Sequence, residues 1–189
     1  MENYRLDYSR AEADIAQTAR YIVDKWSQRG VKIAAAESCT GGMISAAITA
    51  VSGSSAVIEL GVCSYSNRIK QKILGVSQKT LDSFSEYSTQ CAEEMAIGAM
   101  RLADADYGVS TTGVAGPSGG TAQHPVGEVC IAVCSKSGVY SKRFVFDKPL
   151  DGAPSQRDDI RAQAARKALM LLNLMIMTEH EAPQNRENV

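Results

Sequence analysis

The sequence predicts an α/β fold, a three-layer α/β/α sandwich with a mixed, mostly parallel sheet. Two observations favour this class. Short apolar runs that suit buried strands alternate with stretches of helical periodicity, and two strand-like runs late in the chain are joined by a short turn, which predicts an antiparallel hairpin. The 189 residues, 44% of them hydrophobic, suffice for one well-buried core. We expect a single domain over 1–189, with its core at about 9–176 and a polar tail at 179–189.

The first half of the chain is expected to alternate helices with strands. Ser9 and Glu12 form a capping box that begins a helix, and Gly30 ends this helix. The elements that follow are a strand over 31–36, a helix over 43–51, a strand over 56–65 and a short helix that carries Lys70 and ends at Gly75.

The second half continues this alternation and adds the hairpin. Ser88 can cap a helix over 89–104, with Met95, Ala99 and Leu102 facing inward, and a strand over 107–111 follows. The segment 113–127 is rich in glycine and too long for an ordinary turn, which is typical of a functional loop. The last elements are hairpin strands over 128–135 and 139–146 and a helix that Ser155 and Asp158 begin and that ends near Thr178.

Composition narrows the class of protein. A net charge of -1 and a pI near 6.1 give no long-range field that gathers nucleic acid or an anionic membrane surface. Five irregularly spaced cysteines indicate a reducing compartment, and His124 and His180 are too few for a Cys/His zinc cluster. The chain shows no signal-like start or membrane-length apolar run. We expect a cytoplasmic protein that binds neither nucleic acid nor membranes.

A candidate nucleophile lies where the strand at 31–36 gives way to a helix. The backbone N–H groups of Thr40, Gly41 and Gly42 can point at one small volume and stabilise either a phosphate or the oxyanion of a tetrahedral intermediate. A hydroxyl at this place, that of Ser38, can act as a nucleophile. The structural alternative is that Ser38 merely caps the helix.

A serine nucleophile needs a base, and Lys70 is the better candidate because neither histidine is suitably placed for a Ser-His-Asp triad. Its pKa must fall from about 10.4 toward neutrality, through burial or a nearby cation such as Arg68. Tyr65 can donate to the carbonyl or pass a proton to the leaving amine. Cys39 is a rival nucleophile, since a helix N-terminus lowers a thiol pKa. Each of these three residues also has a purely structural interpretation. Lys70 would be a solvated lysine, Tyr65 a half-buried strand aromatic and Cys39 a small buried residue.

Four motifs follow one another along the chain: 35–42 (AAESCTGG), 65–67 (YSN) with Lys70, 112–120 (TGVAGPSGG) and 125–127 (PVG). Together they resemble the CinA C-terminal domain family, over roughly residues 9–176. The resemblance implies a stand-alone form of this domain and a nicotinamide-nucleotide amidohydrolase, which converts nicotinamide mononucleotide and water to nicotinate mononucleotide and ammonia. It implies no metal or organic cofactor, a small-molecule substrate as partner, and a homo-oligomer.

The resemblance also assigns roles to residues. It implies Ser38 as nucleophile, Lys70 as base and Tyr65 as the assisting hydroxyl. The residues that it implies for substrate binding, together with the helix start considered above, are Thr40, Gly41, Gly42, Thr112, Gly113, Gly116, Gly119, Arg157 and Arg161. A dianionic phosphate suits a guanidinium and backbone N–H groups, and a primary amide suits a nucleophile beside oxyanion donors.

The chain departs from the family pattern in two places. Glu86-Tyr87-Ser88 stands where the family often has Ala-Val-Ser, and Ser118 stands where a glycine is common. We expect both changes to be peripheral. The alternative function is a catalytically silent module that binds a nucleotide or a regulatory partner, and the presence of Ser38, Tyr65 and Lys70 argues against it.

Overall fold

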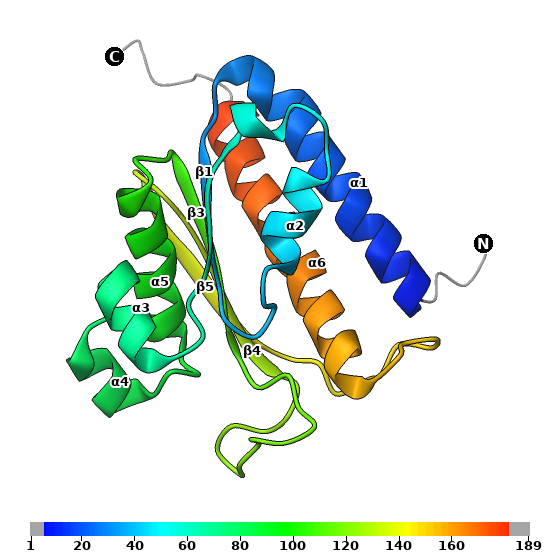
Figure 1. Cartoon of the computed structure of the whole chain (residues 1–189), viewed down its shortest axis with the longest axis vertical. Helices are drawn as coiled ribbons and strands as arrows, with labels where there is room; N and C mark the ends of the chain where they lie inside the picture. The colour runs from blue at the N-terminus through cyan, green and yellow to red at the C-terminus, as the bar shows by residue number, and fades with distance from the viewer. Residues whose placement is uncertain (1–5, 182–189) are drawn as a thin grey trace, which may run out of the picture.

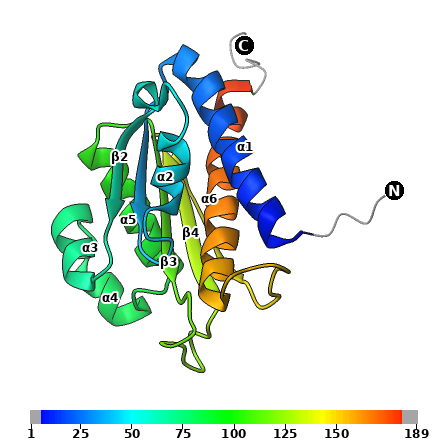
Figure 2. The same cartoon turned by 45° about the vertical axis from the view of Figure 1, so that its right-hand side comes forward.

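A central sheet between two layers of helices forms the protein. The structure is a computed structural model that describes residues 6–181. The sheet has the order β2-β1-β3-β4-β5, with strands β1 (Ile33–Glu37), β2 (Ile58–Cys63), β3 (Tyr107–Gly113), β4 (Glu128–Ser135) and β5 (Gly138–Val145). One face is covered by α1 (Tyr8–Trp26), α2 (Met43–Thr49) and α6 (Gln156–Glu181), the other by α3 (Asn67–Leu74), α4 (Gln78–Phe84) and α5 (Thr89–Leu102) (Figures 1 and 2).

The sheet contains equal numbers of parallel and antiparallel strand pairings. β1 pairs in parallel with β2 and β3, whereas β4 pairs antiparallel with β3 and β5. The predicted three-layer class with a mixed sheet is confirmed. The description 'mostly parallel' is slightly loose, because the hairpin contributes two antiparallel pairings beside the two parallel ones. In register, Glu37 pairs with Cys63 and Thr111, so β1, β2 and β3 end at the same edge of the sheet. In α/β sheets this carboxyl edge is where ligands usually bind.

The core follows from the burial of the strands. β1 and β4 are buried along their whole length. Of the two edge strands, β2 exposes every second residue and β5 exposes most of its residues. On the face of α1 and α6, Trp26 is fully buried and its indole N–H donates to the Asn173 side chain at 2.9 Å. This contact joins the end of α1 to the last turns of α6.

Several elements differ in detail from expectation. Asp7, rather than Ser9, caps α1, since its side chain accepts the Arg10 N–H at 2.7 Å. Leu102 closes α5 and is 57% exposed rather than inward-facing. The polar helix α4 was not expected. The helix α6 runs to Glu181, so the start of the expected tail is helical, and 182–189 lie outside the described residues.

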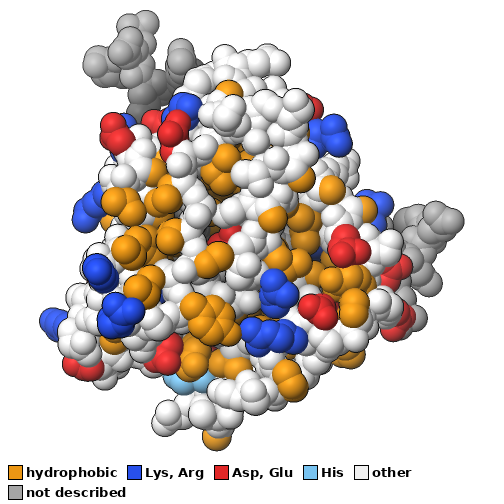
Figure 3. Space-filling model, in the orientation of Figure 1, with side chains coloured by type: hydrophobic (Ala, Val, Ile, Leu, Met, Phe, Trp, Pro, Cys, Tyr) orange, Lys and Arg blue, Asp and Glu red, His pale blue; other side chains and the backbone are white. Residues whose placement is uncertain are grey.

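The surface carries charges of both signs. On the face shown in Figure 3, basic and acidic side chains of the described residues are interspersed with hydrophobic ones rather than gathered by sign. None of the helices within residues 6–181 combines the length and the apolar character needed to cross a membrane.

Candidate active site

Ser38 and Lys70 meet at the carboxyl edge of the sheet. Ser38 follows β1, and Lys70 lies on α3, which follows β2. The Lys70 amine is 3.0 Å from the Ser38 hydroxyl oxygen, although 32 positions separate the two residues. Ser38 is 8% exposed and Lys70 only 1%. The structural alternative of a solvated lysine is therefore wrong, and the hydroxyl has an amine within proton-transfer distance.

The surroundings of Lys70 favour its neutral form. Burial lowers the pKa of Lys70, and the neighbours Cys91, Glu86 and Cys39 oppose that change. Burial, however, raises the pKa of Cys91 to about 11 and that of Cys39 to about 12, so both thiols are uncharged near neutral pH. Glu86 is then the one anion of the three. Arg68 is exposed on α3, so burial rather than this cation lowers the lysine pKa.

Cys39 is a poor rival nucleophile. The expectation that a helix N-terminus lowers its thiol pKa is wrong, because burial raises that pKa to about 12. The thiolate is the reactive form of cysteine. At neutral pH the Cys39 side chain is therefore a small, protonated group beside the candidate nucleophile.

The start of α2 is occupied by a side chain of the protein itself. The Glu37 carboxylate accepts the N–H groups of Gly42 at 3.0 Å, Ile44 at 3.1 Å and Ser45 at 2.9 Å. It also accepts the hydroxyl groups of Thr40 and Ser45, each at 2.7 Å. The expectation that the Gly42 N–H is open to a ligand is wrong, because this N–H already donates to the buried Glu37 carboxylate. The negative charge of that carboxylate also lies at the positive end of the helix dipole.

Thr40 and Gly41 are also engaged within the protein. The Gly41 N–H donates to the Ser38 carbonyl oxygen at 3.2 Å. The Thr40 carbonyl oxygen accepts the Arg161 guanidinium at 3.0 Å, and Thr40 is fully buried. These contacts shape the turn that carries Ser38. Substrate contacts of residues 40–42 through groups other than the N–H groups of Gly41 and Gly42, and those of Arg161, stay predictions.

Because Glu37 satisfies five donors, we expect Glu37→Gln to destabilise the protein. The amide presents an NH2 group to donors that now face a carboxylate, which leaves buried groups without acceptors. The expected loss is about 3 kcal/mol in the free energy of unfolding, or roughly 6–12 °C in Tm. Thermal unfolding followed by circular dichroism measures it.

Glu59→Gln is the matched control for this substitution. Glu59 forms an exposed ion pair with Lys32 at 2.6 Å, and such pairs contribute little to stability. Its Tm should change by no more than about 3 °C. Equal Tm values for the two variants would contradict the role assigned to Glu37.

Arg157 links the glycine-rich loop to Tyr65. It lies in the first turn of α6 and donates to the Gly116 carbonyl oxygen at 2.8 Å and to the Tyr65 hydroxyl at 3.1 Å. Tyr65 is 66% exposed, so it lies at the rim of the site rather than half-buried in a strand. Since its hydroxyl oxygen accepts from Arg157, its own proton is available to a ligand.

A cavity of about 110 Å³ gathers most of these groups. Its lining residues are Ser38, Cys39, Tyr65, Asn67, Lys70, Glu86, Tyr87, Gly113, Ala115 and Arg157. The structure thus brings together all three expected catalytic residues with Gly113 and Arg157. Of the other expected binding residues, Thr112 is buried and does not line the cavity, and Gly119 is exposed in the glycine-rich loop. Within residues 6–181, no three His, Cys, Asp or Glu side chains are grouped so as to hold a metal ion.

Sequence reasoning missed part of this lining. Glu86 and Tyr87 were expected to be peripheral, and that expectation is wrong because both line the cavity with Ser38. The available signal was a polar and an aromatic residue just before the helix cap Ser88. Glu37 was also missed as the residue that orders the turn of Ser38.

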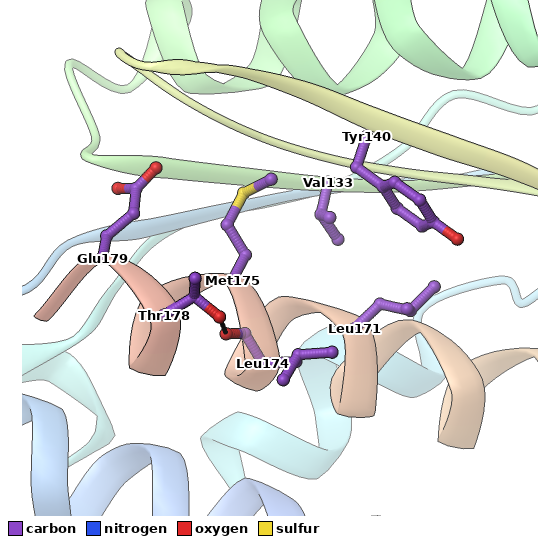
Figure 4. Close-up of a pocket in the computed structure, with 7 residues that line it drawn as sticks. All are labelled: Val133, Tyr140, Leu171, Leu174, Met175, Thr178 and Glu179. Atoms are coloured by element: carbon purple, nitrogen blue, oxygen red, sulfur yellow. Dashed lines mark hydrogen bonds between the residues drawn. The ribbon is translucent and has the colours of Figure 1, made fainter. Parts of the chain in front are cut away.

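A second, larger cavity of about 440 Å³ lies between the hairpin and the end of α6 (Figure 4). Val133 and Tyr140 approach it from β4 and β5, and side chains of α6 form the opposite side. Its one acidic group, Glu179, accepts the hydroxyl groups of Tyr107 at 2.8 Å and Ser135 at 2.5 Å. This cavity is apolar and contains no nucleophile paired with a base.

Comparison with protein families and curated proteins identifies similar sequences. The family model described as the CinA C-terminal domain matches residues 15–176. A CinA-like protein of Shewanella baltica is 39% identical over 166 residues, which cover 88% of this chain and 38% of that protein. A CinA-like protein of Anaeromyxobacter is 42% identical over 155 residues, 82% of this chain and 36% of that protein. The chain spans less than half the length of these curated relatives.

Solved structures with the same fold are also similar in sequence. The crystal structure of the competence/damage inducible protein CihA from Agrobacterium tumefaciens has a TM-score of 0.80 and 38% identity, covering 86% of this chain and 96% of that one. A CinA superfamily protein from Escherichia coli has a TM-score of 0.78 and 31% identity, covering 87% and 92%. The mixed five-stranded sheet with helices on both faces matches these structures.

Proposed function

Because the chain belongs to the CinA C-terminal domain family, we propose that it is an amidohydrolase that converts nicotinamide mononucleotide and water to nicotinate mononucleotide and ammonia. The observation that carries the proposal is the 3.0 Å contact between the Lys70 amine and the Ser38 hydroxyl. A hydroxyl beside a buried amine, in a cavity that also holds Tyr65 and Arg157, has the groups that amide hydrolysis needs.

The first half of the reaction forms an acyl-enzyme. The neutral Lys70 amine takes the Ser38 proton while the oxygen attacks the carboxamide carbon, which gives a tetrahedral intermediate. The C–N bond then breaks, and the proton passes from Lys70 to the leaving nitrogen, so that ammonia departs. Tyr65, whose proton is free of Arg157, donates to the carbonyl oxygen or relays the proton to the nitrogen.

The second half uses water in place of the serine. Lys70 takes a proton from the water molecule as it attacks the acyl carbon. The bond from the acyl carbon to the Ser38 oxygen then breaks, and the serine recovers its proton from Lys70. Nicotinate mononucleotide leaves, and the enzyme returns to its starting protonation state.

The size of the cavity suits one end of this substrate. About 110 Å³ is well below the roughly 300–1,000 Å³ of pockets that enclose whole drug-sized ligands. The carboxamide ring fits beside Ser38, and the ribose phosphate extends toward the rim. The Arg157 guanidinium, which donates to the Tyr65 hydroxyl at that rim, is the proposed partner of the phosphate.

We expect Arg157→Ala to raise KM for nicotinamide mononucleotide by roughly 10–100-fold, the usual range for a lost charge-assisted hydrogen bond. Steady-state kinetics measures it. The same substitution should leave KM for nicotinamide riboside, which lacks the phosphate, nearly unchanged. Arg157→Lys keeps the charge without the planar fork and should lie in between. An equal loss on both substrates would instead assign Arg157 to holding Tyr65 and Gly116.

The proposed activity is tested by ammonia release from nicotinamide mononucleotide by the purified protein across a range of pH values. Stoichiometric formation of nicotinate mononucleotide, abolished in Ser38→Ala, is the expected result. Binding of the nucleotide without ammonia release at any pH would favour the alternative of a silent nucleotide-binding module. The expected homo-oligomer and the cytoplasmic location stay predictions.

A further inference from the structure

The candidate reaction cavity has a wall that the proposed mechanism does not use. Glu86 and Tyr87 line the cavity beside Ser38 and Lys70. They stand in the short connection between α4 and α5, directly before the cap residue Ser88. Nucleophile, base and assisting hydroxyl all come from other segments. The two side chains of this wall are therefore placed to contact a substrate without taking part in the proton transfers.

The central sheet holds this wall from behind. The Thr112 hydroxyl on β3 donates to the carbonyl oxygen of Glu86 at 2.6 Å. The Cys130 thiol on β4 donates to the carbonyl oxygen of Tyr87 at 3.2 Å. Both donor residues are buried. A segment whose carbonyl groups are fixed to the sheet presents its side chains in a defined position, which discrimination between ligands requires.

A hydroxyl, an imidazole and a carboxylate hold the start of the wall. Ser85 Oγ lies 3.1 Å from His124 Nε2, and His124 Nδ1 lies 2.9 Å from Glu128 Oε1. The order of groups is that of a hydrolase triad. However, Ser85 Oγ also accepts the Tyr87 N–H at 3.2 Å, and Arg143 donates to Glu128 at 2.6 Å. Ser85 has a φ of 72°, which is strained for a residue with a Cβ, and these contacts fix that turn.

Glu86 lines the cavity without a salt-bridge partner among the described residues. Its electrostatic partners are Lys70, whose pKa it raises, and Tyr87, whose side chain hydrogen-bonds to it. Among residues 6–181, no lysine, arginine or histidine forms a salt bridge with it. Arg157 donates to Gly116 and Tyr65 instead. A carboxylate that forms no salt bridge in a small cavity attracts a cation. The rings of Tyr65 and Tyr87 also line the cavity, and aromatic faces favour cations as well.

We infer that Glu86, with the Tyr87 ring beside it, is a specificity-determining residue that selects carboxamides on a positively charged aromatic ring over those on a neutral ring. The inference rests on the proposed function, because nicotinamide mononucleotide carries its amide on such a ring, a quaternary pyridinium. Glu86 contacts the charged ring while Ser38 faces the amide attached to it. A neutral ring of similar size fits the same space but loses the attraction.

Binding to the Ser38→Ala protein tests this charge preference without turnover. The probes are nicotinamide mononucleotide and its reduced form, which has the same amide, ribose and phosphate on an uncharged dihydropyridine ring. Calorimetry gives Kd for each probe. We expect the oxidised form to bind more tightly, and Glu86→Gln in the same background to shrink the ratio of the two Kd values roughly tenfold. Because a ratio is compared, losses common to both probes cancel.

Glu93→Gln is the matched control, since Glu93 faces Ser141 on β5 at 2.5 Å and does not line the cavity. An unchanged ratio in Glu86→Gln, or an equal change in Glu93→Gln, would overturn the inference, as would a failure of both probes to bind. Ammonia release by the protein with Ser38 intact is scored separately. A charge preference that depends on Glu86, without ammonia release, would support the inference and refute the proposed function. Ammonia release together with an unchanged ratio of Kd values in Glu86→Gln would support the proposed function and refute the inference.

Discussion

Replacing Ser38 with alanine should reduce ammonia release from nicotinamide mononucleotide by a factor of about 10⁴ or more, the range seen when a nucleophile is removed from a hydrolase. The fold should persist, because the backbone N–H of Ser38 still donates to the Thr111 carbonyl oxygen at 2.9 Å. Single-turnover ammonia release, with unfolding of the two proteins compared by circular dichroism, measures both effects.

Cys39→Ala is the control for this substitution. The Cys39 thiol lies next to Ser38 in the cavity lining, but burial raises its pKa to about 12. Its removal should therefore change kcat by no more than a few fold. Full activity in Ser38→Ala together with no activity in Cys39→Ala would transfer the role of nucleophile to the thiol.

Replacing Lys70 with methionine should lower kcat by roughly 10²–10⁴, which is the usual contribution of a general base. Methionine has a similar length and no charge to desolvate, so Tm should not fall. The neutral amine is the active form, and burial lowers its pKa below the ordinary lysine value. In the wild type, kcat/KM should therefore rise with pH through this lowered pKa and then level off. In Lys70→Met the rise should disappear.

Lys72→Met provides the comparison on the same helix, because Lys72 is exposed on α3. It should keep both the rate and the pH profile of the wild type. A Lys70→Met protein that retained the wild-type rate and the same dependence on pH would remove Lys70 from the mechanism, whatever its distance from Ser38.

Local sequence signals made Ser38 and Lys70 candidates, and the family resemblance implied their pairing. Each residue follows a short apolar strand, and parallel neighbouring strands end at the same sheet edge, so their following segments meet. Gly75 also marked the end of α3, where it has a positive φ, and the structure adds Ser66 as the cap at its start. The distance of 3.0 Å and the burial of the lysine are tertiary facts that spacing does not contain.

The position of Glu86 and Tyr87 in the cavity wall could not be predicted from local sequence, because tertiary contacts determine it. Glu86 and Tyr87 reach the site because Thr112 and Cys130, 26 and 43 positions further along, hold their carbonyl groups. No periodicity within the connection predicts contacts of that range. The helix α4 was missed because its seven residues are mostly polar and leave only Thr80 buried.

The buried Trp26 gives the protein a built-in optical reporter. It is the one tryptophan in the sequence, and its indole lies between α1 and α6. Trp26 precedes the start of β1, whereas Ser38 follows the end of that strand. Its fluorescence therefore comes from a single, buried environment, in which the cations of Lys25 and Arg29 lie over the ring. A red shift of that emission records separation of these two helices, independently of events at the distant hydroxyl.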